Sequence, residues 1–226
     1  MSGKAKAVVL LSGGLDSATC LYWAKSRGYD CHCLLFDYGQ RHKKEIRQAI
    51  KVAKTAKCPY QVIRIALPWK GSALLDKNVS IPRPTPNGQP STVIPSTYVP
   101  ARNTIFLSFA LSYAEAIKAV AVVIGANALD YSGYPDCRPA YFQAARKLFN
   151  LATKAGVEGK KIRILTPLLN KTKAGIIKLG AKLKVPYRLT WSCYRGGSKV
   201  CGTCDSCILR AKGFREAGRP DPAVSG

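Results

Sequence analysis

The chain has 226 residues, 47% of them hydrophobic, which fits one large folded domain with a small appendage and excludes a disordered chain. Its 36 lysines and arginines against 12 aspartates and glutamates give a net charge of +24. This charge fits either a polyanionic partner such as RNA, or a basic solvated surface with a site for nucleotide phosphates. No apolar run reaches the roughly 20 residues that span a bilayer, and the start of the chain shows no cleavable signal pattern. We therefore expect a cytoplasmic protein without a membrane partner, whose nine cysteines are thiols or metal ligands rather than disulfides.

The first third of the chain alternates strands with helices. In chain order, the pattern predicts a strand over residues 5–11, a helix over 16–27, a strand over 31–36, a helix over 41–56 and a strand over 60–66. This alternation predicts an α/β fold, a Rossmann-like parallel sheet with helices on its faces.

The rest of the chain continues the alternation after a long irregular segment. Residues 67–100 are rich in Pro, Gly, Ser and Thr, and long loops of this kind are often functional. In chain order there follow a helix over 102–117, a strand over 119–125, a helix near 140–153, a strand near 162–165 and a helix over 171–183. The composition changes near Trp191, so we predict a catalytic domain over residues 1–189 and a small C-terminal metal-binding segment over 190–226 packed on it.

The stretch SGGLDS, residues 12–17, joins the first strand to the first helix. A glycine-rich turn there presents backbone N–H groups and a helix N-terminus, both of which favour a phosphate. Ser12 and Ser17 add hydroxyl groups, and Asp16 could help to hold Mg²⁺. Taken alone, the stretch fits a simple tight turn with an acid in the first helical turn equally well.

Loops that follow the other strands are expected at the same sheet edge, because ligands bind beyond the carboxyl ends of parallel strands. After the second strand these are Asp37, Gln40, Arg41 and His42, each of which fits a plain helix-entry loop equally well. In PSTYVPARN, Arg102 and Asn103 stand at a helix start, well placed for an anionic group.

The loop GANALDYSGYPDCRPAY, residues 125–141, combines acids with aromatic side chains. Acids can accept from the edge of a purine-like ring and aromatics can stack on its face, so we predict a pocket for a small planar heterocycle, with a polar surface loop as the alternative. Its predicted substrate contacts, together with Asn103, are Asp130, Ser132, Tyr134 and Asp136.

Four cysteines near the end of the chain, Cys193, Cys201, Cys204 and Cys207, have metal-ligand spacing. Two overlapping C-x2-C pairs with one upstream thiol supply the ligands of a closed, structural tetrahedral Zn²⁺ site, and an iron–sulfur cluster is the second choice. Residues 205–214 read as a short helix that packs this site onto the body. Cys20 and Cys33 are expected in the core, and Cys137 near a ligand but not as a nucleophile.

The SGGLDS loop resembles that of the PP-loop ATP pyrophosphatases, whose members bind ATP and release pyrophosphate while adenylating a substrate. With the motifs at residues 12–17, 36–42, 95–103, 127–138, 166–168 and 190–214, nearly the whole chain closely resembles the 7-cyano-7-deazaguanine synthase family of the queuosine pathway. The resemblance implies an adenine nucleotide alpha hydrolase-like fold, a homodimer, one structural zinc on the four cysteines, and a ligase. The implied reaction takes the small molecule 7-carboxy-7-deazaguanine, ammonia and ATP to the nitrile.

Site residues follow from this resemblance and from the chemistry of adenylation, which needs ATP, Mg²⁺ and the acid held in line and charge stabilised on the α-phosphate. We predict catalytic roles for Asp16, Lys171 and Arg102. Two positions depart from the pattern expected of the family, with Lys173 in place of a glutamate and Ala140 in place of an acid. The predicted nucleotide contacts are Leu11, Ser12, Gly13, Gly14, Leu15, Asp16, Ser17, Ala18, Thr19, Cys20 and Leu21.

Two alternatives compete with this hypothesis. A tRNA-modifying thiolase of the same superfamily would suit the basic charge and the C-x2-C pairs, but it needs a catalytic cysteine pair and an RNA-binding module, and no appended module is found. A non-catalytic zinc and nucleic-acid binding module would leave the SGGLDS loop unexplained. We therefore expect no nucleic-acid partner despite the charge of +24.

Overall fold

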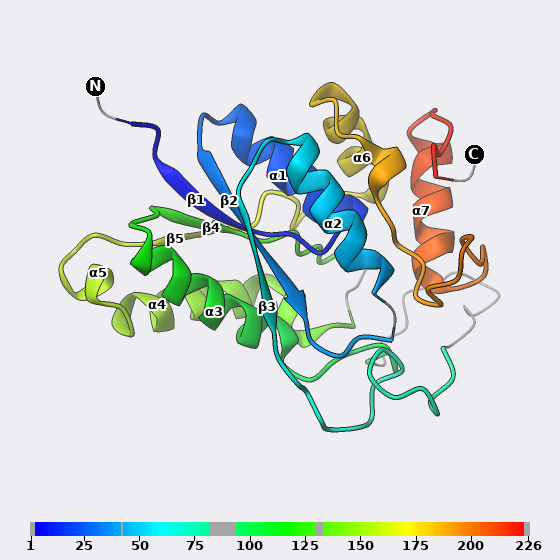
Figure 1. The fold of residues 1–226 in the computed structure, drawn as a ribbon, viewed down its shortest axis with the longest axis horizontal. Helices are drawn as coiled ribbons and strands as arrows, with labels where there is room; N and C mark the ends of the chain where they lie inside the picture. Colours follow the sequence, from blue (N-terminus) through cyan, green and yellow to red (C-terminus); the bar gives the residue numbers. More distant parts are fainter. Residues whose placement is uncertain (1–2, 42, 82–93, 130–132, 224–226) are drawn as a thin grey trace.

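The computed structural model describes residues 3–41, 43–81, 94–129 and 133–223, and in these ranges it shows a five-stranded sheet flanked by helices (Figure 1). All strand pairs are parallel and the strand order is β3-β2-β1-β4-β5. The strands are β1 (Lys6–Leu10), β2 (Asp30–Asp37), β3 (Tyr60–Arg64), β4 (Ala121–Val123) and β5 (Arg163–Leu165). The parallel α/β fold predicted from the sequence is confirmed.

Helices cover both faces of this sheet and bury its alternating side chains. In β1, Ala7 and Val9 belong to one hydrophobic cluster while Val8 and Leu10 belong to the other, because successive side chains of a strand point to opposite faces. The first cluster packs under α1, α2, α6 and α7, and the second under α3 and α4 (Figure 1). The α-helices are α1 (Leu15–Ser26), α2 (Lys44–Thr55), α3 (Arg102–Ala116), α4 (Pro139–Leu151), α5 (Lys154–Val157), α6 (Lys173–Lys182) and α7 (Asp205–Glu216).

The strand order reverses its direction at β1, which lies between β2 and β4. Such a switch point opens a crevice beyond the carboxyl ends of the two central strands. The loop after β1 and the loop after β4 meet there closely. A Cβ on Gly125 would lie 3.1 Å from the backbone of Asp16 and Ser17, so glycine allows this approach.

Each strand and long helix predicted from the sequence is present, with ends that differ by a few residues. The short helix α5 and the 3-10 turns Pro135–Cys137 and Tyr187–Leu189 were not predicted. Phe214 of α7 packs edge-on against Tyr187 and belongs to the cluster that contains α1, so the C-terminal helix shares the core of the main body. The domain boundary after residue 189 stays a prediction. No helix in the described ranges is long and apolar enough to cross a membrane.

Candidate active site

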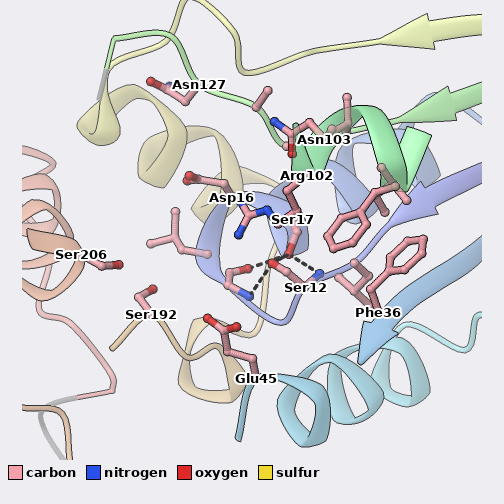
Figure 2. A pocket seen from close by; sticks show the side chains of 18 of the residues that line it. Ser12, Asp16, Ser17, Phe36, Glu45, Arg102, Asn103, Asn127, Ser192 and Ser206 are labelled. Carbon is pink, nitrogen blue, oxygen red and sulfur yellow. Dashed lines mark hydrogen bonds between the residues drawn. The ribbon is translucent and has the colours of Figure 1, made fainter. Parts of the chain in front are cut away.

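A pocket opens at the switch point (Figure 2). Its wall comes from the loop after β1, the end of β2, the start of α3, the loop after β4, the first turn of α6, and the cysteine-bearing segment with α7. Figure 2 labels Asp16, Ser17 and Arg102 among the residues that line the pocket, and Ser192 and Ser206 lie on the wall formed by the C-terminal segment. Of the predicted nucleotide contacts, Leu11, Ser12, Gly14, Leu15, Asp16 and Ser17 line this pocket.

The two serines fix the shape of the loop at residues 12–17. Ser17 Oγ accepts from the Ser12 backbone N–H at 3.2 Å and donates to the Gly14 carbonyl at 3.1 Å, and the two hydroxyls lie 3.0 Å apart. Gly13 has a φ of +87°, and a Cβ there would overlap the carbonyl oxygen of Glu45 and lie 2.7 Å from the Ala49 nitrogen. A side chain at Gly13 would therefore push the loop away from α2.

The remaining predicted nucleotide contacts lie behind the pocket lining. Ala18, Cys20 and Leu21 are fully buried in the core, as expected for Cys20. The Thr19 hydroxyl donates to the Leu15 carbonyl at 2.8 Å and lies 3.0 Å from the Tyr187 hydroxyl. These side chains hold α1 in place beneath the loop.

An ion pair crosses the pocket between α1 and α6. Lys173 Nζ donates to both carboxylate oxygens of Asp16, at 2.9 and 2.8 Å, and both side chains are mostly buried. The glutamate expected at position 173 would have set two carboxylates against each other, whereas lysine satisfies Asp16. Gly213 makes room for this lysine, because a Cβ there would collide with the lysine side-chain stem. Lys171, the lysine selected from the sequence, is exposed and does not line the pocket.

Arg102 brings a second cation into the pocket. Its guanidinium donates to the Tyr38 hydroxyl at 3.3 Å and lies about 6 Å from the ring centres of Tyr38 and Phe106. Phe106 stacks on Phe36 with ring centroids 4.0 Å apart and nearly parallel planes. The pocket thus combines cations with an aromatic wall, a combination suited to a ligand with phosphates and planar rings.

Only some of the predicted site residues in the loop after β2 line the pocket. Gln40 and Arg41 line the pocket. The Arg41 guanidinium is already engaged with the carbonyls of residues 73, 77 and 79. Asp37 instead pairs with Lys43 at 3.5 Å, and His42 lies outside the described residues.

Glu45, the second residue of α2, is a site residue that the sequence reasoning missed. It lines the pocket, and burial raises the pKa of its carboxyl to about 7, although the positive charge of Arg102 lowers it and the negative charge of Cys193 raises it further. A carboxyl that titrates near neutral pH inside a pocket with cations is a typical functional-site feature. Helical spacing alone could not reveal it, because in sequence it is one charge among several at the start of a basic helix.

The predicted substrate contacts have different surroundings. Asp136 does not line the pocket; its carboxylate accepts from the Asn103 backbone N–H at 2.9 Å, at the start of α3. Asn103 and Tyr134 do line it, and the Tyr134 hydroxyl lies 2.7 Å from Thr97 Oγ1. Asp130 and Ser132 lie outside the described residues.

Cys137 lines the pocket, as expected of a cysteine near a ligand. Asn103 Nδ2 lies 3.4 Å from the Cys137 sulfur, and burial raises the pKa of this thiol to about 11. The thiol is therefore protonated at neutral pH, which disfavours a nucleophilic role. In the described part of the chain it is the one cysteine that lines the pocket, whereas a thiolase would need a pair.

The four clustered cysteines form a compact group beside the pocket. The sulfurs of Cys193, Cys201, Cys204 and Cys207 all lie within 4.8 Å of one another, and those of Cys201 and Cys207 are 3.9 Å apart. Sulfurs bound at about 2.3 Å to one tetrahedral zinc lie about 3.8 Å apart, so the group fits such an ion. Hydrogen bonds from Cys204 and Cys207 lower the pKa of the Cys193 thiol and favour the thiolate that a metal binds.

A parallel sheet with helices on both faces and a serine- and glycine-rich loop at its switch point defines an α/β fold of the PP-loop type. Solved structures agree with this fold. An NMN synthetase from Francisella tularensis has a TM-score of 0.50 at 14% identity, covering 95% of this chain and 87% of that chain. A predicted subunit of tRNA methyltransferase from Methanocaldococcus jannaschii also has a TM-score of 0.50, at 16% identity, covering 97% and 91%.

Sequence comparison then identifies the family. The model of the queuosine biosynthesis protein QueC matches residues 6–218, and the chain belongs to the QueC family. The chain is 56% identical to the 7-cyano-7-deazaguanine synthase of Nostoc punctiforme over 97% of this chain and 99% of that protein. It is 54% identical to the synthase of the same name from Acetivibrio thermocellus, over 96% of each. The chain is accordingly an ATP-dependent enzyme of the ligase class that forms C–N bonds.

Proposed function

We propose that the pocket at the switch point binds ATP together with 7-carboxy-7-deazaguanine and converts the acid, with ammonia, into 7-cyano-7-deazaguanine. Membership of the QueC family supports this activity. The observation that carries the location is the pair of Asp16 on α1 and Lys173 on α6, with Arg102 in the same pocket. These groups bring two cations to a loop whose helix start favours phosphate.

The chemistry proceeds in two adenylations. In the first, a carboxylate oxygen attacks the α-phosphorus of ATP, pyrophosphate leaves, and the acyl group becomes an acyl adenylate. Ammonia then attacks the acyl carbon, AMP leaves with the former carboxylate oxygen, and a proton is released to give the amide. In the second, the amide oxygen attacks the α-phosphorus of a second ATP and pyrophosphate leaves. AMP then departs with the former amide oxygen, and the nitrogen loses two protons to give the nitrile.

The residues of the pocket suit the charges that develop in these steps. Lys173 and Arg102 stabilise negative charge on the phosphates, because a cation in a partly dry site acts more strongly than in water. Asp16 orients Lys173 through both carboxylate oxygens, and it is also the candidate ligand for Mg²⁺. Mg²⁺ would neutralise phosphate charge when bound. Ser12 and Ser17 line the pocket, and the hydrogen bonds of their hydroxyls shape the loop to which we assign the leaving pyrophosphate.

Recognition of the two planar ring systems is assigned to the aromatic and amide side chains. Phe36, Tyr38 and Phe106 offer the stacking surface, and Asn103 and Tyr134 are the candidate polar contacts for the deazaguanine. We retain Asp130 and Ser132 as predicted contacts from the sequence. The four cysteines are proposed to hold one structural zinc. We expect a homodimer in the cytoplasm. Light scattering on the purified protein would test the dimer.

The test is release of pyrophosphate that depends on the acid. The purified protein is incubated with Mg²⁺ and ATP, with and without 7-carboxy-7-deazaguanine, in the absence of ammonium. We expect one enzyme equivalent of pyrophosphate only when the acid is present, because the adenylate stays bound. Release that needs no acid, or no release by protein that retains its metal, would contradict the proposal.

A further inference from the structure

The segment that carries the four thiols also builds one wall of the active-site pocket. We call residues 190–216 the thiol segment. Cys193 stands between two of the pocket-lining residues, and Ser206 stands between the thiols of Cys204 and Cys207 in sequence. The residues of the thiol segment that line the pocket are Trp191, Ser192, Tyr194, Ser206, Leu209 and Arg210.

A direct hydrogen bond joins the thiol segment to the phosphate loop. The backbone N–H of Trp191 donates to the Gly13 carbonyl at 2.9 Å. The indole Nε1–H of the same residue donates to the Cys193 carbonyl at 3.0 Å, and the whole side chain is buried. One residue therefore contacts both the loop that we assign to ATP and the backbone of a metal ligand.

Lys44, the first residue of α2, makes a second link. Its Nζ lies 3.4 Å from the centre of the Trp191 ring, and it donates to the carbonyls of Gly197 and Ser198 at 3.1 and 2.6 Å. The next residue of the helix, Glu45, has its carbonyl against Gly13. The start of α2 thus touches the phosphate loop on one side and holds the turn between Cys193 and Cys201 on the other.

We propose that metal binding at the four thiols and nucleotide binding at the phosphate loop are energetically coupled, with Lys44 and Trp191 as the positioning residues that connect them. The proposal rests on the proposed ATP site. Loss of the metal frees the turn that Lys44 holds, and with it Trp191 and its hydrogen bond to Gly13. Because coupling is reciprocal, bound nucleotide must strengthen metal retention by the same factor by which metal strengthens nucleotide binding.

The experiment follows zinc leaving the loaded protein. Zinc-loaded enzyme is mixed with an excess of a chromogenic chelator, with and without a non-hydrolysable ATP analogue in excess Mg²⁺, and the rate of release is recorded. Nucleotide affinity is measured separately by calorimetry on the same sample. We expect saturating analogue to slow the release of zinc by at least about fivefold, the lower end of typical allosteric coupling.

Two variants localise the coupling. Lys44→Ala removes the bridge and should reduce the protection by nucleotide to less than about twofold, while Lys51→Ala removes an exposed lysine from the same helix and should keep the full protection. Equal release rates with and without bound analogue would overturn the coupling, and full protection in Lys44→Ala would overturn the role of this lysine. If calorimetry shows no nucleotide binding, the proposed function itself fails, so the two failures are distinguishable.

Discussion

Replacing Asp16 by asparagine keeps the shape of the side chain but removes the charge that faces Lys173. The two side chains are 21% and 11% exposed, and both carboxylate oxygens accept from the ammonium group. At these N–O distances of 2.9 and 2.8 Å, two unit charges attract by about 6 kcal/mol at an effective dielectric constant of 20. Since the pair is partly exposed and the asparagine oxygen still accepts one hydrogen bond, we expect a loss of about 1–2 kcal/mol in the free energy of unfolding.

The effect of Asp16→Asn on turnover should be larger than its effect on stability. A lysine that is no longer held against the phosphates loses stabilisation of the developing charge, and removal of one such group costs about 100- to 1000-fold in kcat. Turnover is measured as AMP formed per enzyme, and stability by urea unfolding.

A double-mutant cycle with Lys173→Met shows whether the two side chains act as one unit. We expect the double variant to be little worse in kcat than either single variant, because each change disables the same arrangement. Lys178→Met, an exposed lysine of the same helix, is the control and should keep wild-type turnover. Turnover within about threefold of wild type in both Asp16→Asn and Lys173→Met would refute the reasoning.

Three further predictions follow from individual groups. Burial raises the pKa of Glu45 from 4.5 to about 7 in the folded protein, so the contribution of this carboxyl to the unfolding free energy falls as the pH rises from 4.5 to 7. Glu45→Gln removes that loss and should gain about 3 kcal/mol over the wild type at pH 8 relative to pH 4.5, and a pH-independent difference in urea titrations would count against it. Gly13→Ala should be less stable than Gly28→Ala by about 1–3 kcal/mol in the same titrations. Both glycines have a positive φ, but only a Cβ on Gly13 would meet other atoms, whereas Gly28 has none within 4 Å. Equal losses of stability would argue against close packing of Gly13 on α2. Cys204→Ser should reduce bound zinc well below one per chain by elemental analysis and lower the melting temperature, and full zinc content in this variant would exclude the sulfur as a ligand.

The fold could be predicted because each element carries a local signal. Buried parallel strands read as continuous apolar runs, and in this chain such runs alternate with longer helical segments. The spacing of the four cysteines likewise predicted their grouping, since two C-x2-C pairs bring thiols together wherever the segment packs. The loop at Ser12 could be placed because it follows the first strand directly, so its position at the sheet edge needs no distant contact.

Side chains that enter the pocket from distant elements were harder to predict. Lys171 and Lys173 differ by two positions at the start of α6, and only the orientation of that helix against α1 decides which of them meets Asp16. Trp191 reaches the phosphate loop through a contact between residues almost 180 positions apart, which no local pattern reports.

Asp136 shows why the role of an acidic loop residue is hard to predict from the sequence. An acid in a polar loop suggests a substrate contact, which stays a prediction, and in the structure its carboxylate accepts from the backbone N–H of Asn103 at the start of α3. Capping interactions of this kind use the same residue types as binding sites, so the sequence alone does not separate them.

The central claim, adenylation of the same substrate twice in one pocket, is tested most directly by following oxygen. The enzyme is supplied with 7-carboxy-7-deazaguanine labelled with ¹⁸O at both carboxylate positions, together with ATP, Mg²⁺ and ammonium, and the products are weighed by mass spectrometry. We expect the nitrile and two molecules of AMP for each nitrile, each AMP carrying one ¹⁸O. Unlabelled AMP, or label found in inorganic phosphate, would contradict it.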